Sequence, residues 1–357
     1  MLRHDKEPSK YPVLRVALKG ERQIAREKHS RRTRDAQGKA PEALVSSTGS
    51  TPDGLPLSYS RAPAPDIAPW VQSLAAVDIE AATDRHECCF FSCNPAIRVF
   101  LKGKWTVETA KGPFEFDTSS GGRTVYFGPQ TKAMPVKVEG PMRFLLLQFH
   151  PGAPPLDQSL THTQMLNRIE CFDQGLPDDI RQAGYGPSEE REAWLDHFEG
   201  HTRRVLFDRV TQEPPELALA TYRRILTDPA TGVEDMARDF GISRRTLERQ
   251  VKESFGISPK KVIRRARALD MAAALLGVAM PQEEAEFRLR YFDQSHMTRE
   301  INAYFGMAPG VLSRQDAILL RIDLEVRQMR RLEAMGELGI EHVPWRDPDA
   351  EPTSRDD

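Results

Sequence analysis

The sequence predicts a multidomain α+β protein, with a β-sandwich or barrel near the N-terminus, helices after it, and an all-α C-terminal region. Between 97 and 149, β-branched and aromatic runs alternate with glycine and proline turns roughly every ten residues, which favours a sandwich or small barrel. After Pro151 the apolar residues recur at helical spacing, and residues 241–259 are repeated 50 positions later at 291–309. The 357 residues are enough for two ordinary domains.

We expect five parts along the chain. These are a disordered basic tail (1–55), a β-rich domain (56–155), a helical connector (156–213), a helical domain that holds both repeat copies (214–315), and a helical extension with an acidic tail (316–357). The tail is too polar to offset its chain entropy by burial, and a weak phosphate-contacting arm is the alternative interpretation. The expected strands are Ile97–Leu101, Trp105–Thr109, Phe114–Phe116, Thr124–Phe127, Val136–Val138 and Met142–Phe149.

The connector is dominated by a predicted helix over 188–210. Its apolar stripe is formed by Trp194, Leu195, Phe198, Val205 and Leu206. A stripe of this kind shows that one face is buried, but not against what. Packing against the β-rich domain and pairing with a second subunit are therefore both open at this point.

Cysteine and histidine usage argues against a metal centre. Three of the four cysteines, Cys88, Cys89 and Cys93, fall within six residues, and Cys171 is distant. Neighbouring strand residues point to opposite faces, so ordinary thiols are favoured over a zinc site. His197 and His201 share a helical face, but the glutamate of a zinc helix is missing, which favours ordinary surface histidines.

Whole classes of function lack support in the sequence. There is no phosphate loop, nucleophile elbow or dinucleotide fingerprint, so we predict a protein that is not an enzyme, with no catalytic residues, no cofactor and no metal. The chain has no run of about 20 apolar residues and no secretory signal, which predicts a cytoplasmic protein without membrane contact. The formal net charge is -2, but the region 223–267 is rich in arginine. Local charge sets an electrostatic footprint, so this region could bind an anionic partner.

The first repeat copy has the pattern of a helix-turn-helix. A short helix over Val233–Phe240 is followed by Gly241, which adopts positive φ at little cost. Ser243 can cap the next helix, which should run to about Phe255. In this motif the second helix enters the major groove of DNA, and its early residues reach base edges.

The outer faces of the two second helices supply the candidate DNA contacts. In the first copy Leu247, Val251 and Phe255 should face the core, and in the second copy Met297, Ile301 and Phe305 should do so. The residues that remain outside are Arg244, Arg245, Glu248, Arg249 and Lys252 in the first copy and Gln294, Ser295, His296 and Arg299 in the second. Arginine can bond guanine bidentately and glutamate can accept from cytosine. For each single residue, a solvated surface role is about as plausible.

A basic helix is predicted between the two copies. It should run from Pro259 to about Leu276, which gives a length of ~28 Å at about 1.5 Å per residue. Major-groove faces on one side of a duplex recur every ~34 Å, so a connector of this length suits two helices in adjacent grooves.

Several of these residues resemble the signature of AraC-type transcriptional regulators. The resemblance rests on two stretches, Tyr291–His296 with Arg299 and Tyr304–Pro309 in the second copy, and Ala237–Ser243 with Gly256–Pro259 in the first. It covers roughly 220–312. It implies that the C-terminal module binds double-stranded DNA, and that an N-terminal β-rich domain senses a small-molecule effector or forms a homodimer. RNA polymerase is a further partner that such a regulator implies. More weakly, the strands ending at Phe149–Ala153 resemble the cupin-like sensor domain of some members.

Two residues depart from the family pattern in the second motif. Arg290 stands where the family usually has the turn glycine, and Glu286 stands at the close-packing position that is usually alanine. A bulky residue at positive φ costs ~1 kcal/mol, so we expect the second motif to be distorted or to read DNA less specifically than the first. We therefore hypothesise that the first motif carries most of the sequence specificity.

Two other functions remain as alternatives. A DNA-repair alkyl-acceptor protein fused to such a module would need four well-spaced cysteines with one activated thiolate. The spacing of Cys88, Cys89, Cys93 and Cys171 does not supply this. The other alternative is an interaction protein whose second motif is degenerate. Salt-dependent binding to DNA separates it from a DNA-binding regulator.

Overall fold

The structure is a computed structural model. It describes residues 44–45, 58–79, 85–157, 159–173, 180–181, 190–209, 213–228, 230–279, 287–288, 291 and 293–337. Most of the predicted tail at 1–55 lies outside these residues, as do Glu286 and Arg290 and the acidic end of the chain after 337.

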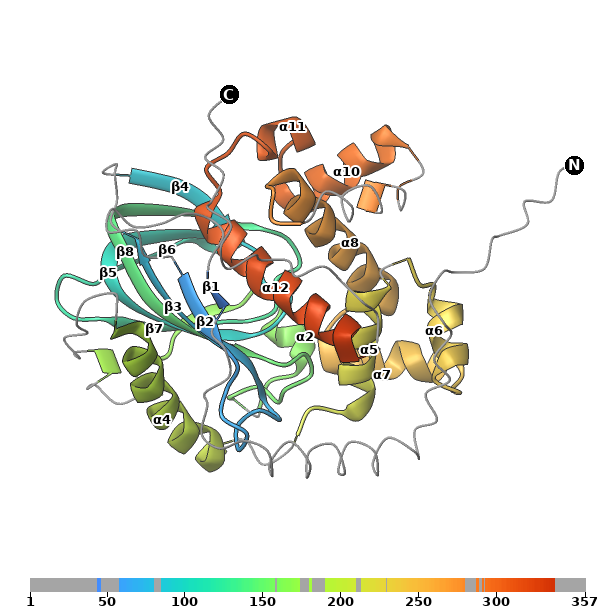
Figure 1. Ribbon diagram of the computed structural model, residues 1–357, viewed down its shortest axis with the longest axis horizontal. Helices are drawn as coiled ribbons and strands as arrows, with labels where there is room; N and C mark the ends of the chain where they lie inside the picture. The colour runs from blue at the N-terminus through green and yellow to red at the C-terminus, as the bar shows by residue number, and fades with distance from the viewer. Residues whose placement is uncertain are drawn as a thin grey trace, which may run out of the picture.

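The N-terminal half is one curled antiparallel sheet (Figure 1). The strands are β1 (Leu44–Val45), β2 (Ser58–Arg61), β3 (Val71–Ile79), β4 (Arg85–Phe90), β5 (Ala96–Thr109), β6 (Gly112–Asp117), β7 (Arg123–Phe127), β8 (Met134–Phe149) and β9 (Ile169–Cys171). The hydrogen-bonded order is β1-β2-β3-β8-β5-β7-β9, with β4 added to β8 and β6 added to β5. The two long strands bend where their register shifts between Phe100 and Lys104. Gly103, at φ +99°, lies in this bend, where a Cβ would come within 2.9 Å of the Pro141 carbonyl oxygen.

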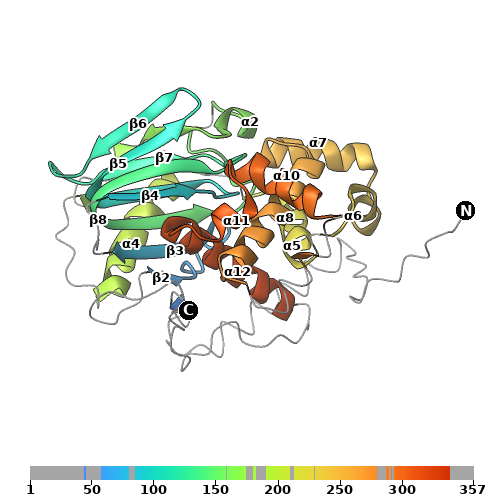
Figure 2. The ribbon, with the colours of Figure 1, turned by 90° about the horizontal axis from the view of Figure 1, so that it is seen from above.

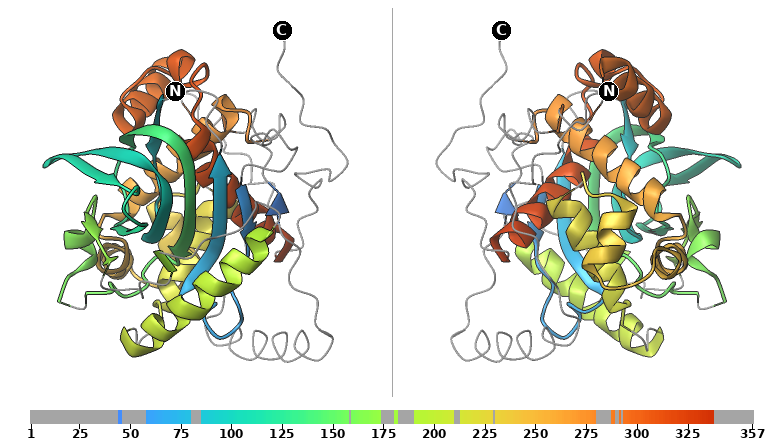
Figure 3. Two further views of the ribbon diagram at one scale, coloured as in Figure 1. Left: turned by 90° about the vertical axis from the view of Figure 1, so that its left-hand side faces the viewer. Right: turned by 90° about the vertical axis from the view of Figure 1, so that its right-hand side faces the viewer.

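The two faces of the sheet have separate cores. The inner face is filled by aromatic side chains, with the Phe100 ring centroid 4.6 Å from Trp105 and 4.8 Å from Phe116. The outer face is covered by α4 (Arg191–Arg209), whose Trp194 and Phe198 join the second core (Figure 3). The apolar stripe of the connector therefore packs against the sheet of its own chain.

The C-terminal half is helical, which confirms the predicted α+β fold class. Its helices follow the short α2 (His162–Met165) and are α5 (Glu216–Thr227), α6 (Val233–Asp239), α7 (Arg244–Phe255), α8 (Pro259–Leu275), α10 (Gln294–Phe305), α11 (Pro309–Leu312) and α12 (Ile318–Glu337). Seen from above, they lie beside the sheet and not over its outer face (Figure 2). α6 and α7 share one core with α5 and the start of α8, while α10 and α11 pack around the end of α8.

The last described helix, α12, returns to the sheet. It runs diagonally between the strands and the helices α5 and α8 (Figure 1), and its Leu319 and Ile322 enter the inner core of the sheet. Beside them, Asp323 Oδ1 lies 3.1 Å from Arg98 Nη2 on β5, and both side chains are almost fully buried. The guanidinium of Arg98 also lies over the rings of Phe90 and Phe127, at 4.2 and 4.5 Å from their centroids. Burial raises the pKa of Asp323 even though Arg98 opposes this.

The Arg98–Asp323 pair yields a stability prediction. Asp323→Asn keeps the shape of the side chain but leaves the buried Arg98 charge uncompensated, which should cost about 3–5 kcal/mol of unfolding free energy. Urea denaturation of the full chain measures this. Asp316→Asn, at an exposed position just before α12, is the matched control and should be nearly neutral. A loss below about 1 kcal/mol for Asp323→Asn would show that α12 is not anchored by this pair.

Candidate nucleic-acid interface

The first helix-turn-helix has the geometry that its sequence predicts. α6 ends at a turn in which Gly241 has φ +66°. Ser243 then caps α7, because its side chain accepts a hydrogen bond from the Thr246 backbone N–H at 3.1 Å. α7 ends at Gly256, which has φ +73°. Leu247, Val251 and Phe255 are buried in one core with Met236, Ala237 and Phe240.

The outer face of α7 presents all five predicted contact residues. Arg244, Arg245, Arg249 and Lys252 are exposed, and Glu248 is half-buried. With Glu253, the helix has four cationic and two acidic side chains, a net charge of +2.

Several of these charges are paired within the free protein. Arg244 Nε lies 2.8 Å from Glu248 Oε1, and its Nη1 bonds Glu234 on α6. Hydrogen bonding to Glu248 raises the pKa of Arg244, so this side chain is charged at any physiological pH. Arg249 Nη1 lies 3.0 Å from Glu253. Exposed pairs of this kind are weak and screened by salt, so a DNA phosphate or base can replace the carboxylate.

The second motif is described only in part. α10 is capped by Asp293, whose side chain accepts from the His296 N–H at 2.6 Å, and it ends at Gly306 with φ +72°. Its Met297, Ile301 and Phe305 are buried as predicted. The helix and turn that should precede α10 are outside the described residues apart from 287–288 and 291, so the effect of Glu286 and Arg290 stays a prediction.

The four candidate residues on α10 separate into two groups. Gln294, Ser295 and Arg299 are exposed on the outer face, and Arg299 Nε donates to the Ser295 carbonyl at 3.3 Å. His296 is half-exposed, with its ring 5.5 Å from that of Tyr291 and its Nε2 3.9 Å from Glu300. Apart from His296, α10 has one cation and one anion. The anion, Glu300, is buried, so the outer face of α10 offers the single cation Arg299 and is less basic than that of α7.

The connecting helix α8 bears further basic residues that were not among the candidate contacts. It spans 17 residues, about 26 Å at 1.5 Å per residue. Lys260 and Lys261 are exposed in its first turn, next to the end of α7. The pair of lysines after Ser258-Pro259 was the available sequence signal, because a helix start and adjacent cations both favour phosphate.

Residues of the N-terminal half contact both motifs, mostly through hydrogen bonds to backbone carbonyl groups. The Ala133 N–H donates to the Tyr304 carbonyl of α10 at 2.8 Å, and Phe91 packs on Phe305 with ring centroids 5.3 Å apart. The buried Arg265 of α8 donates to the Gln130 carbonyl at 2.7 Å. Near the first motif, the Thr163 hydroxyl donates to the Gly256 carbonyl at 3.3 Å. The helices are thus tied to the loop between β7 and β8 and to α2.

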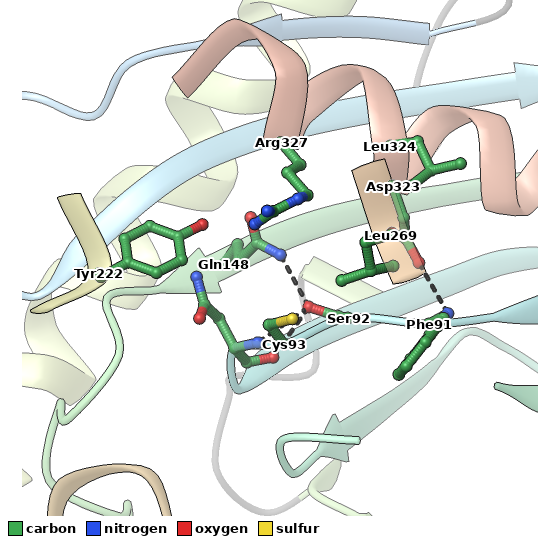
Figure 4. A pocket seen from close by; sticks show the side chains of 10 residues that line it. Phe91, Ser92, Cys93, Gln148, Tyr222, Leu269, Asp323, Leu324 and Arg327 are labelled. Carbon is green, nitrogen blue, oxygen red and sulfur yellow. Dashed lines mark hydrogen bonds between the residues drawn. The ribbon is translucent and has the colours of Figure 1, made fainter. Parts of the chain in front are cut away.

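A pocket lies where the sheet meets three of the helices (Figure 4). The space in it that admits a water-sized sphere is only about 20 Å³, far smaller than a typical ligand site. Its walls come from β8 and the turn after β4, from α5, from α8 and from α12, and its lining residues are Phe91, Ser92, Cys93, Asn94, Gln148, Tyr222, Leu269, Asp323, Leu324 and Arg327. The charged groups in it are already paired, Asp323 with Arg98 and Arg327 with Asp270 at 2.8 Å, so the pocket is polar but close to neutral.

The cysteines and the histidine pair do not form a cluster of metal ligands. Cys88 and Cys89 lie on β4, Cys93 follows it, and Cys171 lies on β9, which is not paired with β4. His197 and His201 have their Nε2 atoms 3.0 Å apart, and Arg204 bonds His201 as well. Within the described residues, no group of three or more His, Cys, Asp or Glu side chains could hold a metal ion. None of the described helices combines the length and apolarity needed to cross a membrane.

Comparison with known proteins identifies the helical half. Residues 236–315 match the model of a family described as a helix-turn-helix domain, which is of the AraC type. The C-terminal region of this chain therefore contains an AraC-type helix-turn-helix domain, which supports a DNA-binding transcription regulator. No curated protein sequence matches the chain.

Solved structures with a similar arrangement are distant. ToxT from Vibrio cholerae is 9% identical, with a TM-score of 0.44 over 68% of this chain and 99% of ToxT. ToxT from strain SCE256 with a bound unsaturated fatty acid is 12% identical, with a TM-score of 0.39 over 69% and 96% of the two chains. The AraC-like transcriptional activator CuxR is 16% identical, with a TM-score of 0.24 over 60% and 86%. These similarities are too low to support an inference about ligands.

The two helix-ending glycines give a matched stability prediction. Gly256 and Gly306 have nearly the same φ, so alanine should strain each backbone by about 1–2 kcal/mol. At Gly306 an added Cβ meets nothing within 4 Å, whereas at Gly256 it would lie 2.7 Å from the His162 carbonyl oxygen. Gly256→Ala should therefore lower the free energy of unfolding by at least about 1 kcal/mol more than Gly306→Ala. Equal losses in urea denaturation would mean that α2 does not rest on the first motif.

Proposed function

We propose that this protein binds double-stranded DNA sequence-specifically, with α7 and α10 in neighbouring major grooves, to regulate transcription. The outer face of α7 carries the proposal: an exposed set of arginines on a well-capped second helix, held only by weak surface ion pairs. The contact residues are Arg244, Arg245, Glu248, Arg249 and Lys252 on α7 and Gln294, Ser295, His296 and Arg299 on α10. Lys260 and Lys261 would contact phosphates beside α7.

The two helices contribute unequally to base recognition in this proposal. α7 offers several cations and an acid for direct contacts, whereas α10 offers one exposed arginine, and His296 points toward Glu300. The first motif should therefore supply most of the sequence discrimination. The second should supply a second point of attachment, which fixes the orientation of the protein on DNA.

Arginine substitutions test this division. A duplex selected from a random-sequence library by the full chain is the probe, and fluorescence anisotropy measures binding. Arg249→Ala should lose about 1–3 kcal/mol of discrimination against a changed base, whereas Arg299→Ala should lose less. Lys260→Ala is the control for phosphate contact, and should weaken binding to all sequences and lower the salt slope by about 1. Equal losses of discrimination for Arg249→Ala and Arg299→Ala would contradict the proposal.

For the N-terminal half we propose effector sensing through the pocket between sheet and helices. Because the cavity is only about 20 Å³, a molecule that enters it would have to move β8, α5, α8 and α12 apart, and its binding would thereby alter how the helices rest on the sheet. Hydroxyl, amide and paired charged groups line the pocket, which suits a small, neutral molecule that bears hydroxyl or amide groups. We also propose that this regulator forms a homodimer and contacts RNA polymerase, and we assign no residues to either role.

The sensing role predicts a ligand-dependent stability. A panel of small neutral hydroxylated and amide compounds should contain members that raise the Tm of the protein, because a ligand that binds only the folded state stabilises it by mass action. Tyr222→Phe, which removes one hydroxyl from the pocket, should reduce the shift without changing the Tm of the free protein by more than about 2 °C. A shift that Tyr222→Phe leaves unchanged would place the ligand elsewhere, and a panel without any shift would count against sensing at this pocket.

A further inference from the structure

One carboxylate of the candidate interface is buried among cations. Glu300, on the inner side of α10, is 1% exposed. Its Oε1 lies 2.6 Å from Arg264 Nε and 3.9 Å from Arg267 Nη2, both on α8, and 3.9 Å from His296 Nε2 one turn earlier on α10. The hydrogen bond to Glu300 raises the pKa of Arg264, so the guanidinium in this contact is cationic.

A buried ion pair restricts geometry more than it adds stability. An apolar residue at the same place could fill the space between the helices equally well, and would allow them to slide or rotate. The Arg264–Glu300 hydrogen bond, by contrast, holds only at a narrow range of distances and angles between α8 and α10. Glu300 therefore fixes α10 at one place along α8.

The first motif is not held in the same way. The position that matches Glu300 in the repeat is Gln250 on α7, a neutral and half-exposed side chain. α7 is set instead by the short turn at Gly256 that joins it directly to α8. α10 has no such direct connection, since residues 276–293 separate it from α8. Its place therefore depends on contacts, namely Glu300 with α8 and the Tyr304 carbonyl with Ala133.

We infer that Glu300 is a positioning residue that sets the separation of α7 and α10, and thereby the spacing between the two halves of the DNA site. This inference rests on the proposed DNA-binding function. It adds that one buried contact determines which distance between the two halves of the DNA site the protein prefers. Arg264 is the partner that carries the effect, because its Nε lies closest to the carboxylate. Glu300 itself would touch no base and no phosphate.

Selection from a random-sequence duplex library, followed by binding to spacing variants, tests the inference. The wild-type chain should enrich two sequence blocks at one fixed spacing, and prefer that spacing by about tenfold over a site lengthened by about two base pairs. Glu300→Ala should enrich the first block with the second block lost or at variable spacing, and its spacing preference should fall to about threefold or less. Glu300→Gln, which retains an acceptor for Arg264, should recover part of the preference.

Control variants separate positioning from base contact and from folding. Arg299→Ala, on the outer face of α10, should change base preference within the second block and keep the spacing. Asn302→Ala, exposed on the same helix, should change neither. Arg264→Ala removes the other member of the ion pair, which is more exposed than Glu300. It therefore tests the same contact if the Glu300→Ala protein does not fold cooperatively.

The outcomes distinguish this inference from the function on which it rests. If the wild-type chain selects two blocks and both Glu300→Ala and Arg264→Ala keep the same spacing preference, the positioning role is overturned and the DNA-binding proposal stands. If the wild-type chain selects no two-block site, the proposed use of both helices fails, and the positioning role fails with it.

Discussion

The arrangement of the two motifs depends on the buried contact between the helical half and the sheet. This interdomain seam is formed by α8, α10 and α12 on one side, and by β4, β5 and the loop of residues 128–133 on the other. Polar contacts cross it at Arg265 to Gln130, at Tyr304 to Ala133 and at Asp323 to Arg98. Without these contacts, α7 and α10 would be linked mainly through α8 and the chain around residues 276–293. With them, α8 and α10 are each attached to the sheet domain, and the Thr163–Gly256 hydrogen bond attaches the first motif to α2.

Buried charges at the seam select one geometry. A guanidinium that donates to a particular carbonyl or carboxylate must keep its distance and direction, and a misplaced one leaves a buried charge unpaired. α12 adds to this effect because Asp323 faces the sheet while Arg327, one turn later, faces Asp270 of α8 at 2.8 Å. The same helix thus binds both the sheet and the helix that connects the two motifs.

Local signals in the sequence predicted the motifs well. Ser243 and Asp293 cap their helices and Gly256 and Gly306 end them, because capping and positive φ are set by residues next to each other in the chain. The periodicity of Leu247, Val251 and Phe255 also correctly gave the buried face of α7. The strands from β5 to β8 were predicted only in part. Ile97–Leu101 and Trp105–Thr109 form the single strand β5, and Val136–Val138 and Met142–Phe149 form the single strand β8, so the two turns expected between them were wrong.

Contacts between distant residues could not be predicted in this way. Arg98 and Asp323 are 225 positions apart, and nothing local to α12 indicates that its residues Leu319 and Ile322 enter the core of the sheet. Glu300 also stands in a helix whose polar residues otherwise face solvent, so its burial follows only from the docking of α10 on α8. His296 was predicted outside for the same reason, and it lies turned toward that carboxylate. Strand register and helix docking depend on contacts between residues far apart in the chain, so local sequence patterns do not predict them.

Hydroxyl-radical footprinting of the full chain on a selected duplex tests the central claim most directly. If α7 and α10 are held by the seam as one unit, the protein should protect two patches on the same face of the duplex, about one helical turn apart. Protection of a single patch, or of two patches on opposite faces, would contradict the account.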